Sequence, residues 1–327
     1  MNATLEVKDL STHFFTRAGV VKAVDSISFS VERGQVLGLV GESGSGKTVT
    51  GLSIMGLVDR PGRIVSGSIK LAGQELVGLS ERDWRTIRGR KIAMIFQDPM
   101  MTLNPVLRID TQMIETVLAH ADVSRESARE RSRQALSRVG IPSPDERLTA
   151  YPHQFSGGMR QRVAIAIALL HDPELIIADE PTTALDVTIQ AQIIAQVQKL
   201  AAETGTSIVW VTHDLAVVSG LSDRLAVMYA GRLIEEGPTA EVLRHPHHPY
   251  TLGLLNSLPI NNPQGQPLNQ IPGSTPSLLR LPPGCPFGPR CSHRQDDCAS
   301  AAPPETSVDH GVRLRCFHPV ARQGALA

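Results

Sequence analysis

The sequence predicts an α/β fold: a mostly parallel sheet with an antiparallel β-subdomain and a helical subdomain, followed by a small proline-rich C-terminal extension. Three observations predict this fold. Aliphatic, strand-like runs alternate with helical segments after residue 156, which favours a parallel sheet covered on both faces. A glycine-rich loop joins an apolar strand to a helix near residue 41. Fifteen of the 23 prolines lie beyond Gly237, so we expect a main domain over residues 1–237 and an extension over residues 238–327.

Strand patterns dominate the first hundred residues. Alternating apolar and polar residues predict two antiparallel strands between Leu5 and Val31, joined by a loop near residues 17–20. The apolar run Val36–Val40 predicts a third strand, and helical spacing follows from Thr48 to about Leu57. Two further features are expected: a short hairpin over residues 67–71 and 73–76, and a buried strand over residues 91–96.

Helical periodicity replaces the strand pattern between residues 98 and about 165, which predicts the helical subdomain there. Its first helices are expected over residues 108–120 and 124–139, and prolines at 142 and 144 end the second one. The alternation of elements then continues with a helix over 159–170, a strand over 175–178, a helix over 188–204 and a strand over 207–212.

Charge and hydropathy exclude several classes of protein. The 327 residues carry 32 Lys plus Arg and 32 Asp plus Glu, so the chain lacks the broad basic field of a non-specific nucleic-acid binder, and no nucleic-acid partner is expected. No apolar run approaches the roughly 20 residues that span a bilayer, and the N-terminus lacks the pattern of a signal peptide. We therefore expect a cytoplasmic protein that reaches a membrane only through a partner.

The segment GESGSGKT, residues Gly41–Thr48, matches the phosphate-binding pattern G-x-x-x-x-G-K-[ST] in full. Glycines let several backbone N–H groups turn toward one phosphate, and the following helix N-terminus adds partial positive charge. Lys47 can reach the β and γ phosphates, and the Thr48 hydroxyl suits Mg²⁺. The predicted phosphate-contacting residues are Gly41, Ser43, Gly44, Ser45, Gly46, Lys47 and Thr48.

Two further segments carry chemistry. The strand LIIADE ends in Asp179 and Glu180, where Asp179 can hold Mg²⁺ through water and Glu180 can orient or deprotonate an attacking water; the alternative is a pair that caps the next helix. The segment QFSGGMRQR places Ser156, Gly157 and Gly158 just ahead of a helix, which makes a second potential phosphate site.

Six short motifs or single residues occur in the order and approximate spacing seen in one family. They are GESGSGKT, Gln97, SGGMRQR, LIIADE, Ala184-Leu185-Asp186 and His213. Over residues 4 to 237 the chain resembles the nucleotide-binding subunit of ATP-binding cassette (ABC) transporters. The resemblance implies a P-loop NTPase cassette that binds ATP and Mg²⁺. It also implies that two cassettes pair head to tail, so that Ser156–Gly158 of one faces the γ-phosphate held by the phosphate loop of the other.

The same resemblance implies individual roles. Gln97 would contact Mg²⁺ and the attacking water while sensing the transmembrane partner, and it joins Glu180 and His213 as the catalytic residues. Asp186 would bridge the dimer seam and His213 would contact the γ-phosphate. An aromatic ring upstream of the loop stacks on adenine in this family; Phe14 fits best, and Phe15 is the competitor.

The C-terminal extension indicates which group of ABC transporters the chain resembles. HPYTLGLLNSLP from His248 and GCPFGPRC around Cys285 and Cys291 are similar to the extension of oligopeptide and dipeptide importer ATPases, with the dipeptide group the closer likeness. This implies a peripheral protein at the cytoplasmic face of the inner membrane. Its partners would be a second, different ATPase subunit, two transmembrane permease subunits and a periplasmic peptide-binding protein. Nickel and glutathione importers share these features, and a soluble ABC ATPase outside transport is the alternative of another class.

All four cysteines lie in the extension: Cys285, Cys291, Cys298 and Cys316, spaced C-x5-C-x6-C-x17-C. Their clustering in an otherwise cysteine-free chain favours a metal site over a disulfide, although the C-x2-C pairs of common zinc ribbons are missing. Resemblance to dipeptide importers favours a [4Fe-4S] cluster, with Zn²⁺ or reduced free thiols as alternatives.

Overall fold

The fold is described from a computed structural model in which residues 3–183, 185–262 and 265–320 are placed; Ala184 of the predicted triplet lies outside them. The chain divides into two compact units. The helical unit comprises the described residues up to Leu5, Val31–Gln35 and Leu71–Trp210. The loop unit comprises Glu6–Ser30, Val36–Lys70 and the described residues from Val211 onward. The predicted phosphate loop and the predicted extension therefore lie in the same unit.

Parallel strands form the centre of the main sheet of the loop unit. β3 (Val36–Val40) pairs in parallel with β9 (Arg224–Tyr229), and all five residues of β3 are buried, as expected of a strand covered on both faces. β10 (Arg232–Pro238) pairs antiparallel with β9. Ala230 and Gly231 join the two strands, both with positive φ, which matches the twist of the paired strands.

A second, antiparallel sheet of the loop unit places β1 (Leu5–Thr16) between β2 (Gly19–Val31) and β4 (Gly62–Leu71). β4 begins at Gly62, five residues earlier than the predicted strand over residues 67–71. Gly67 lies within the strand at φ +100°, where a Cβ would lie 2.5 Å from the Cα of Leu10. The glycine thus permits a close approach of two strands.

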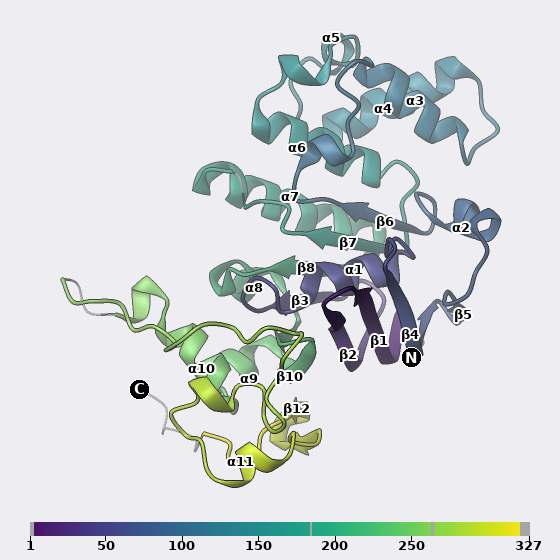
Figure 1. Cartoon of the computed structure of the whole chain (residues 1–327). Helices are drawn as coiled ribbons and strands as arrows, with labels where there is room; N and C mark the ends of the chain where they lie inside the picture. The colour runs from purple at the N-terminus through teal and green to yellow at the C-terminus, as the bar shows by residue number, and fades with distance from the viewer. Residues whose placement is uncertain (1–2, 184, 263–264, 321–327) are drawn as a thin grey trace. The chain divides into compact units, whose positions relative to one another are not determined.

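The helical unit contains a parallel pair of its own, β6 (Ile92–Ile95) with β7 (Leu175–Asp179), and every residue of both strands is buried. Helices α3 to α6 lie together (Figure 1) over the region predicted as the helical subdomain. The helices of this unit are α2 (Glu81–Ile87), α3 (Ile109–Leu118), α4 (Arg125–Arg138), α5 (Pro144–Leu148), α6 (Gly157–Ala168) and α7 (Val187–Thr204).

Two of these helices were not predicted. α2 begins after Ser80, whose Oγ accepts from the backbone N–H of Asp83 at 3.2 Å, so a helix-capping pattern was present in the sequence. α5 has Pro144 in its first turn; this proline starts a helix as well as following the end of α4, because a missing N–H costs nothing at that position. No helix in the described ranges is both long and apolar enough to cross a lipid bilayer.

Short elements make up the extension, as its proline content predicts. Its strands β11 (Thr306–Val308) and β12 (Val312–Leu314) pair with each other, and β12 pairs with β10, so the extension continues the main sheet of the loop unit (Figure 1). The remaining elements of this unit and its border are α1 (Lys47–Ile54), β8 (Ser207–Thr212), α8 (Leu215–Leu221), α9 (Thr239–Arg244), α10 (Pro249–Asn256) and α11 (Asp297–Ser300).

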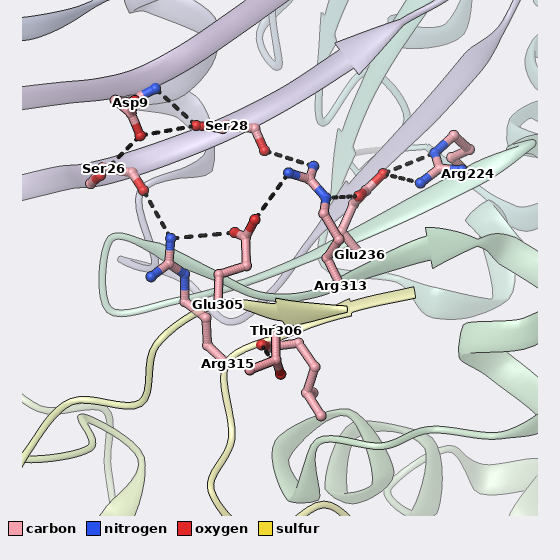
Figure 2. Close-up of polar contacts among 10 residues, drawn as sticks. Asp9, Ser26, Ser28, Arg224, Glu236, Glu305, Thr306, Arg313 and Arg315 are labelled. Carbon is pink, nitrogen blue, oxygen red and sulfur yellow. Dashed lines mark hydrogen bonds and ion pairs between the residues drawn. The ribbon is translucent and has the colours of Figure 1, made fainter. Parts of the chain in front are cut away.

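Ion pairs fasten the extension to β10 (Figure 2). Glu236, only 3% exposed, accepts from Arg224 Nε and Nη2 at 2.9 and 2.7 Å and from Arg313 Nε at 2.8 Å. Arg313 also donates to the carbonyl oxygen of Ser28 on β2 at 2.8 Å and to Glu305 at 3.2 Å. A buried carboxylate between two guanidiniums is fully compensated, so this part of the extension is held in one register on the sheet.

Candidate functional site

The predicted phosphate loop connects the end of β3 to the start of α1 at Lys47. Two of its glycines have no room for a side chain. A Cβ on Gly41 would lie 2.2 Å from the carbonyl oxygen of Met228, and one on Gly46 would lie 2.2 Å from that of Ala23. Gly46 also has a φ of +108° and is the N-cap of α1. Packing of the loop against neighbouring backbone therefore explains these two glycines before any ligand is considered.

The functional groups of the loop differ in exposure. Lys47 is buried, and its ammonium donates to the carbonyl oxygens of Gly41 at 2.8 Å and Glu42 at 3.1 Å. Ser43, Gly44 and Thr48 are exposed, whereas Ser45 is buried. The ammonium thus lies inside the curve of the loop, and the exposed residues can be reached by a ligand. This arrangement suits the binding of phosphate at a helix N-terminus.

Three side chains of the extension contact Glu42, the second residue of the loop. Arg290 Nη1 donates to Glu42 Oε2 at 2.6 Å and Nη2 donates to Oε1 at 3.0 Å. Thr275 Oγ1 donates to Oε2 at 3.2 Å, and the Tyr250 hydroxyl accepts the Glu42 backbone N–H at 2.9 Å. The Arg290 guanidinium holds the pKa of the Glu42 carboxyl below its usual range. Sequence reasoning missed these contacts, whose partners lie more than 200 residues away along the chain.

Gln97, Asp179 and Glu180 follow the ends of the two parallel strands of the helical unit. Gln97 Nε2 donates to Glu180 Oε2 at 3.4 Å, and Thr183 Oγ1 donates to the same oxygen at 3.1 Å. Asp179, the last residue of β7, is buried. Glu180 has a φ of +45°, an unfavourable conformation for a residue with a side chain that is concentrated at functional sites. Two of the three predicted catalytic residues are thus in contact.

Ser156, Gly157 and Gly158 form the start of α6. The Ser156 hydroxyl is the N-cap and accepts the Met159 N–H at 3.3 Å; Ser156 and Gly157 are exposed. A Cβ on Gly158 would lie 2.8 Å from Ile189 Cγ2. The start of this 12-residue helix is therefore exposed at Ser156 and Gly157 and is lined by small residues, which suits a helix N-terminus that binds an anion.

Asp186 also caps a helix in the helical unit, because its Oδ1 accepts the Ile189 N–H at 2.9 Å at the start of α7. It is exposed. The capping contact is sufficient to explain an aspartate here, so its predicted role at a dimer seam stays a prediction.

His213 and the two phenylalanines belong to the loop unit. His213 follows β8 directly and is exposed. The ring of Phe14 lies over Gly62, where a Cβ would come within 2.6 Å of Phe14 Cε1. Phe15 is 40% exposed, and the guanidinium of Arg63 lies 4.4 Å from its ring centroid. One face of each ring is therefore in contact with protein, and the choice of Phe14 as the adenine partner stays a prediction.

The four cysteines line one small cavity of about 10 Å³, together with His248, His293 and His318. None of the four forms a disulfide bond. Burial raises the pKa of Cys285 and Cys291, and it raises that of Cys316 to about 12. Converging soft donors of this kind fit a thiolate-bound metal centre, which would remove their protons on binding.

The spacing of ligand atoms differs from that of a closed zinc site. Tetrahedral zinc with bonds of about 2.3 Å requires sulfurs about 3.8 Å apart. Within the described ranges, the only group of three possible ligand atoms lying within 4.8 Å of one another is Asp297, Cys298 and His318. His318 Nε2 lies 2.7 Å from Asp297 Oδ1. No three of the four cysteine sulfurs therefore lie within 4.8 Å of one another.

Comparison with known proteins adds two family matches. Residues 24–183 match the model of the ABC transporter family, and residues 234–298 match that of the oligopeptide/dipeptide transporter C-terminal region. The oligopeptide transport ATP-binding protein OppD of Salmonella typhimurium is 49% identical over 98% of this chain and 95% of its own length. The oligopeptide transport ATP-binding protein AppD of Bacillus subtilis is 46% identical over 97% of both chains.

Solved structures agree on the fold. A dimeric ATP-binding cassette in a post-hydrolysis state with ADP and Pi matches with a TM-score of 0.65 and 26% identity, over 72% of this chain and 98% of that one. A further match is a subunit of a Clostridium perfringens ABC transporter complex, with a TM-score of 0.63 and 27% identity, over 74% of this chain and 91% of the other. The predicted α/β cassette fold is confirmed.

Proposed function

This chain belongs to the ABC transporter ATPase family and carries the C-terminal region of the oligopeptide/dipeptide group, and from that premise we propose that it hydrolyses ATP to power peptide import. The observation that carries the proposal is the extension, because the cassette alone serves many kinds of transporter. Relatives named for oligopeptide transport cover nearly the whole chain. Dipeptides and oligopeptides are the proposed cargo.

The proposal is tested by deleting the gene in its host and supplying an essential amino acid only as a peptide. Growth should fail and should return with the wild-type gene. Loss of growth on nickel-limited medium or of glutathione uptake, with peptide use intact, would point to the nickel or glutathione importers instead. Recovery of the protein in the soluble fraction of cells, with no transport defect, would favour a soluble ABC ATPase.

We propose the following roles for the residues of the ATP site. Gly41–Thr48 binds the phosphates, and Thr48 and Gln97 hold Mg²⁺, with Asp179 acting through water. Glu180 orients the attacking water, Gln97 links it to the transmembrane subunits, and His213 contacts the γ-phosphate. Phe14 stacks on adenine. The geometric support is the contact of Gln97 with Glu180 and the exposed first turn of α6.

A second cassette completes the site in this proposal. Ser156–Gly158 and Asp186 lie at exposed helix starts, where they can meet the ATP held by another chain. The proposed assembly is a heterodimer with a different ATPase subunit, bound to two permease subunits and served by a periplasmic peptide-binding protein. The chain would then act at the cytoplasmic face of the inner membrane. Within it, residue 237 remains the proposed boundary between cassette and extension.

Replacing Glu180 tests the catalytic assignment. Glu180→Gln preserves size but removes the negative charge that orients water, so turnover should fall roughly a hundredfold or more while ATP binding persists. ATP hydrolysis and nucleotide affinity are measured on the same preparation, and Glu81→Gln on the exposed α2 is the control. Unchanged hydrolysis would remove Glu180 from its role.

For the cysteine site we propose a [4Fe-4S] cluster held by Cys285, Cys291, Cys298 and Cys316. The convergence of all four cysteines on one cavity supports a thiolate-bound centre, and the small size of that cavity favours the alternative, a single Zn²⁺. Either would cross-link segments of a proline-rich region that has few regular elements. Protein purified without oxygen should be brown and absorb near 400 nm, a broad region typical of such clusters. Colourless protein with stoichiometric zinc would exclude the cluster.

A further inference from the structure

Glu42 presents an electrostatic problem for a loop that binds a nucleotide. Glu42 is the second residue of the phosphate loop, and its side chain, which ends in a carboxylate, is only 29% exposed. A negative charge held there opposes the approach of the negatively charged phosphates. Lys47 is the one basic residue in the loop sequence, and its ammonium donates to the backbone carbonyl oxygens of Gly41 and Glu42.

Arg290 resolves this problem from the extension. Its side chain is 5% exposed and forms a bidentate pair with Glu42. The guanidinium is itself held in place, because its Nε donates to the Pro272 carbonyl oxygen at 2.9 Å and its Nη1 approaches the Tyr229 hydroxyl at 3.4 Å. Because the guanidinium is bonded to Glu42 on one side and to other protein groups on the other, the ion pair is held in one geometry.

Tyr250 reinforces the contact on the backbone. Its hydroxyl accepts the Glu42 N–H, and its ring lies 4.7 Å from that of Tyr229, centroid to centroid. Phe287, three residues before Arg290, packs against both tyrosine rings at 5.3 and 5.4 Å. The backbone of Glu42 is thus held by this aromatic cluster, and its side chain is held by Arg290, whose guanidinium lies 5.8 and 6.0 Å from the ring centroids of Tyr229 and Phe287.

We propose that Arg290 is a positioning residue for nucleotide binding: it neutralises Glu42 and holds it in place, so that the extension sets the affinity of the phosphate loop. Arg290 acts through Glu42 and does not itself need to touch nucleotide. The inference rests on the proposed binding of ATP by this loop. The extension would thereby contribute to the ATP site of its own cassette as well as marking the transporter group.

A double-mutant cycle on the full-length protein tests the charge relation. The dissociation constant of MgADP is measured by calorimetry for wild type, Arg290→Gln, Glu42→Gln and the double variant. Arg290→Gln should weaken binding by about tenfold in the wild-type background, the size of one partly screened charge interaction. In the Glu42→Gln background the same change should alter binding less than about twofold, because the carboxylate that it neutralises is gone.

Arg313→Gln is the matched control, since Arg313 also fastens the extension by an ion pair but contacts Glu236 and not the loop. It should leave MgADP affinity unchanged. Equal weakening by Arg290→Gln in both backgrounds, or no weakening in either, would overturn the inference. Failure of the wild-type protein to bind MgADP at all would instead overturn the proposed function.

A measurement on the unaltered protein covers the case in which Arg290→Gln does not fold. Coupling between two sites is reciprocal, so MgADP should slow amide hydrogen exchange in the segment from Phe287 to Cys291. The β11–β12 hairpin, which is fastened elsewhere, should exchange at the same rate with and without nucleotide. Identical exchange of residues 287–291 in both states would contradict the coupling.

Discussion

Replacing Glu236 measures how firmly the extension is fastened to the sheet. Glu236→Gln keeps the shape of the side chain but removes the charge shared by Arg224 and Arg313 (Figure 2). The substitution removes the charge from the pairing with each guanidinium, and each pairing has a net value of about 1.5 kcal/mol, at the lower end of the range, because both arginines are partly exposed. Detachment of β12 from β10 breaks the pairing with Arg313 but not the one with Arg224 on β9, so the local opening free energy of β12 should fall by about 1.5 kcal/mol.

Hydrogen exchange of β12 reports this change directly. The Arg315 N–H donates to the Ile234 carbonyl oxygen at 2.9 Å, so it exchanges only when the strand detaches from β10. A loss of about 1.5 kcal/mol corresponds to roughly tenfold faster exchange at pH 7. The matched control is Glu81→Gln, which breaks the ion pair with Arg88 at an exposed site and should change exchange of α2 less than about twofold. Equal, small effects of both substitutions would refute the view that Glu236 fastens the extension.

Two further predictions concern the loop unit. Gly46→Ala should lower the melting temperature of the nucleotide-free protein more than Gly44→Ala, because both have positive φ but only a Cβ at 46 meets a backbone oxygen, that of Ala23; equal melting temperatures would contradict this. Burial lowers the pKa of His248 from 6.5 to about 4. Unfolded chains bind this proton below pH 6.5 and the folded chain does not, so stability should fall between pH 6.5 and 4, by about 3 kcal/mol in total. His248→Asn keeps an acceptor for the Tyr250 N–H and should remove that part of the acid sensitivity in denaturant titrations; an unchanged pH dependence would exclude His248 as its source.

The elements that the sequence predicted are those with a local signal. β3, β6, β7 and β8 are short, mostly apolar runs in which every residue is buried, and strands covered on both faces need no other pattern. The glycine-rich loop between β3 and α1 likewise carries its own steric and chemical signature. Most predicted residues of the nucleotide site therefore lie at strand ends and helix starts.

β10 shows why other elements were missed. Its sequence RLIEEGP places two adjacent glutamates in the strand, a pattern typical of an exposed turn, yet both are buried. Glu236 is compensated by arginines 12 residues before and 77 residues after it. Glu235 accepts the N–H groups of His247 and His248 at 2.7 and 3.0 Å. A buried charge becomes acceptable only through partners that a local window of sequence does not contain.

The partners of Glu42 were hidden for the same reason. The loop motif predicts a phosphate site, but it does not indicate which group compensates the charge of the Glu42 carboxylate. A glutamate at the second position of the motif needs a compensating cation. That requirement is the one signal that could have indicated a distant arginine.

The bond between Glu42 and Arg290 spans 248 residues of chain, and this sets an order of events during synthesis. A ribosome releases the phosphate loop early, at a rate of several residues per second, whereas Arg290 emerges only after most of the chain has been made. For that interval the loop carries an uncompensated carboxylate and lacks its tyrosine contact. The loop therefore reaches its final form late, and a chain that stops short of Arg290 leaves the ribosome with the phosphate motif present but its surroundings incomplete.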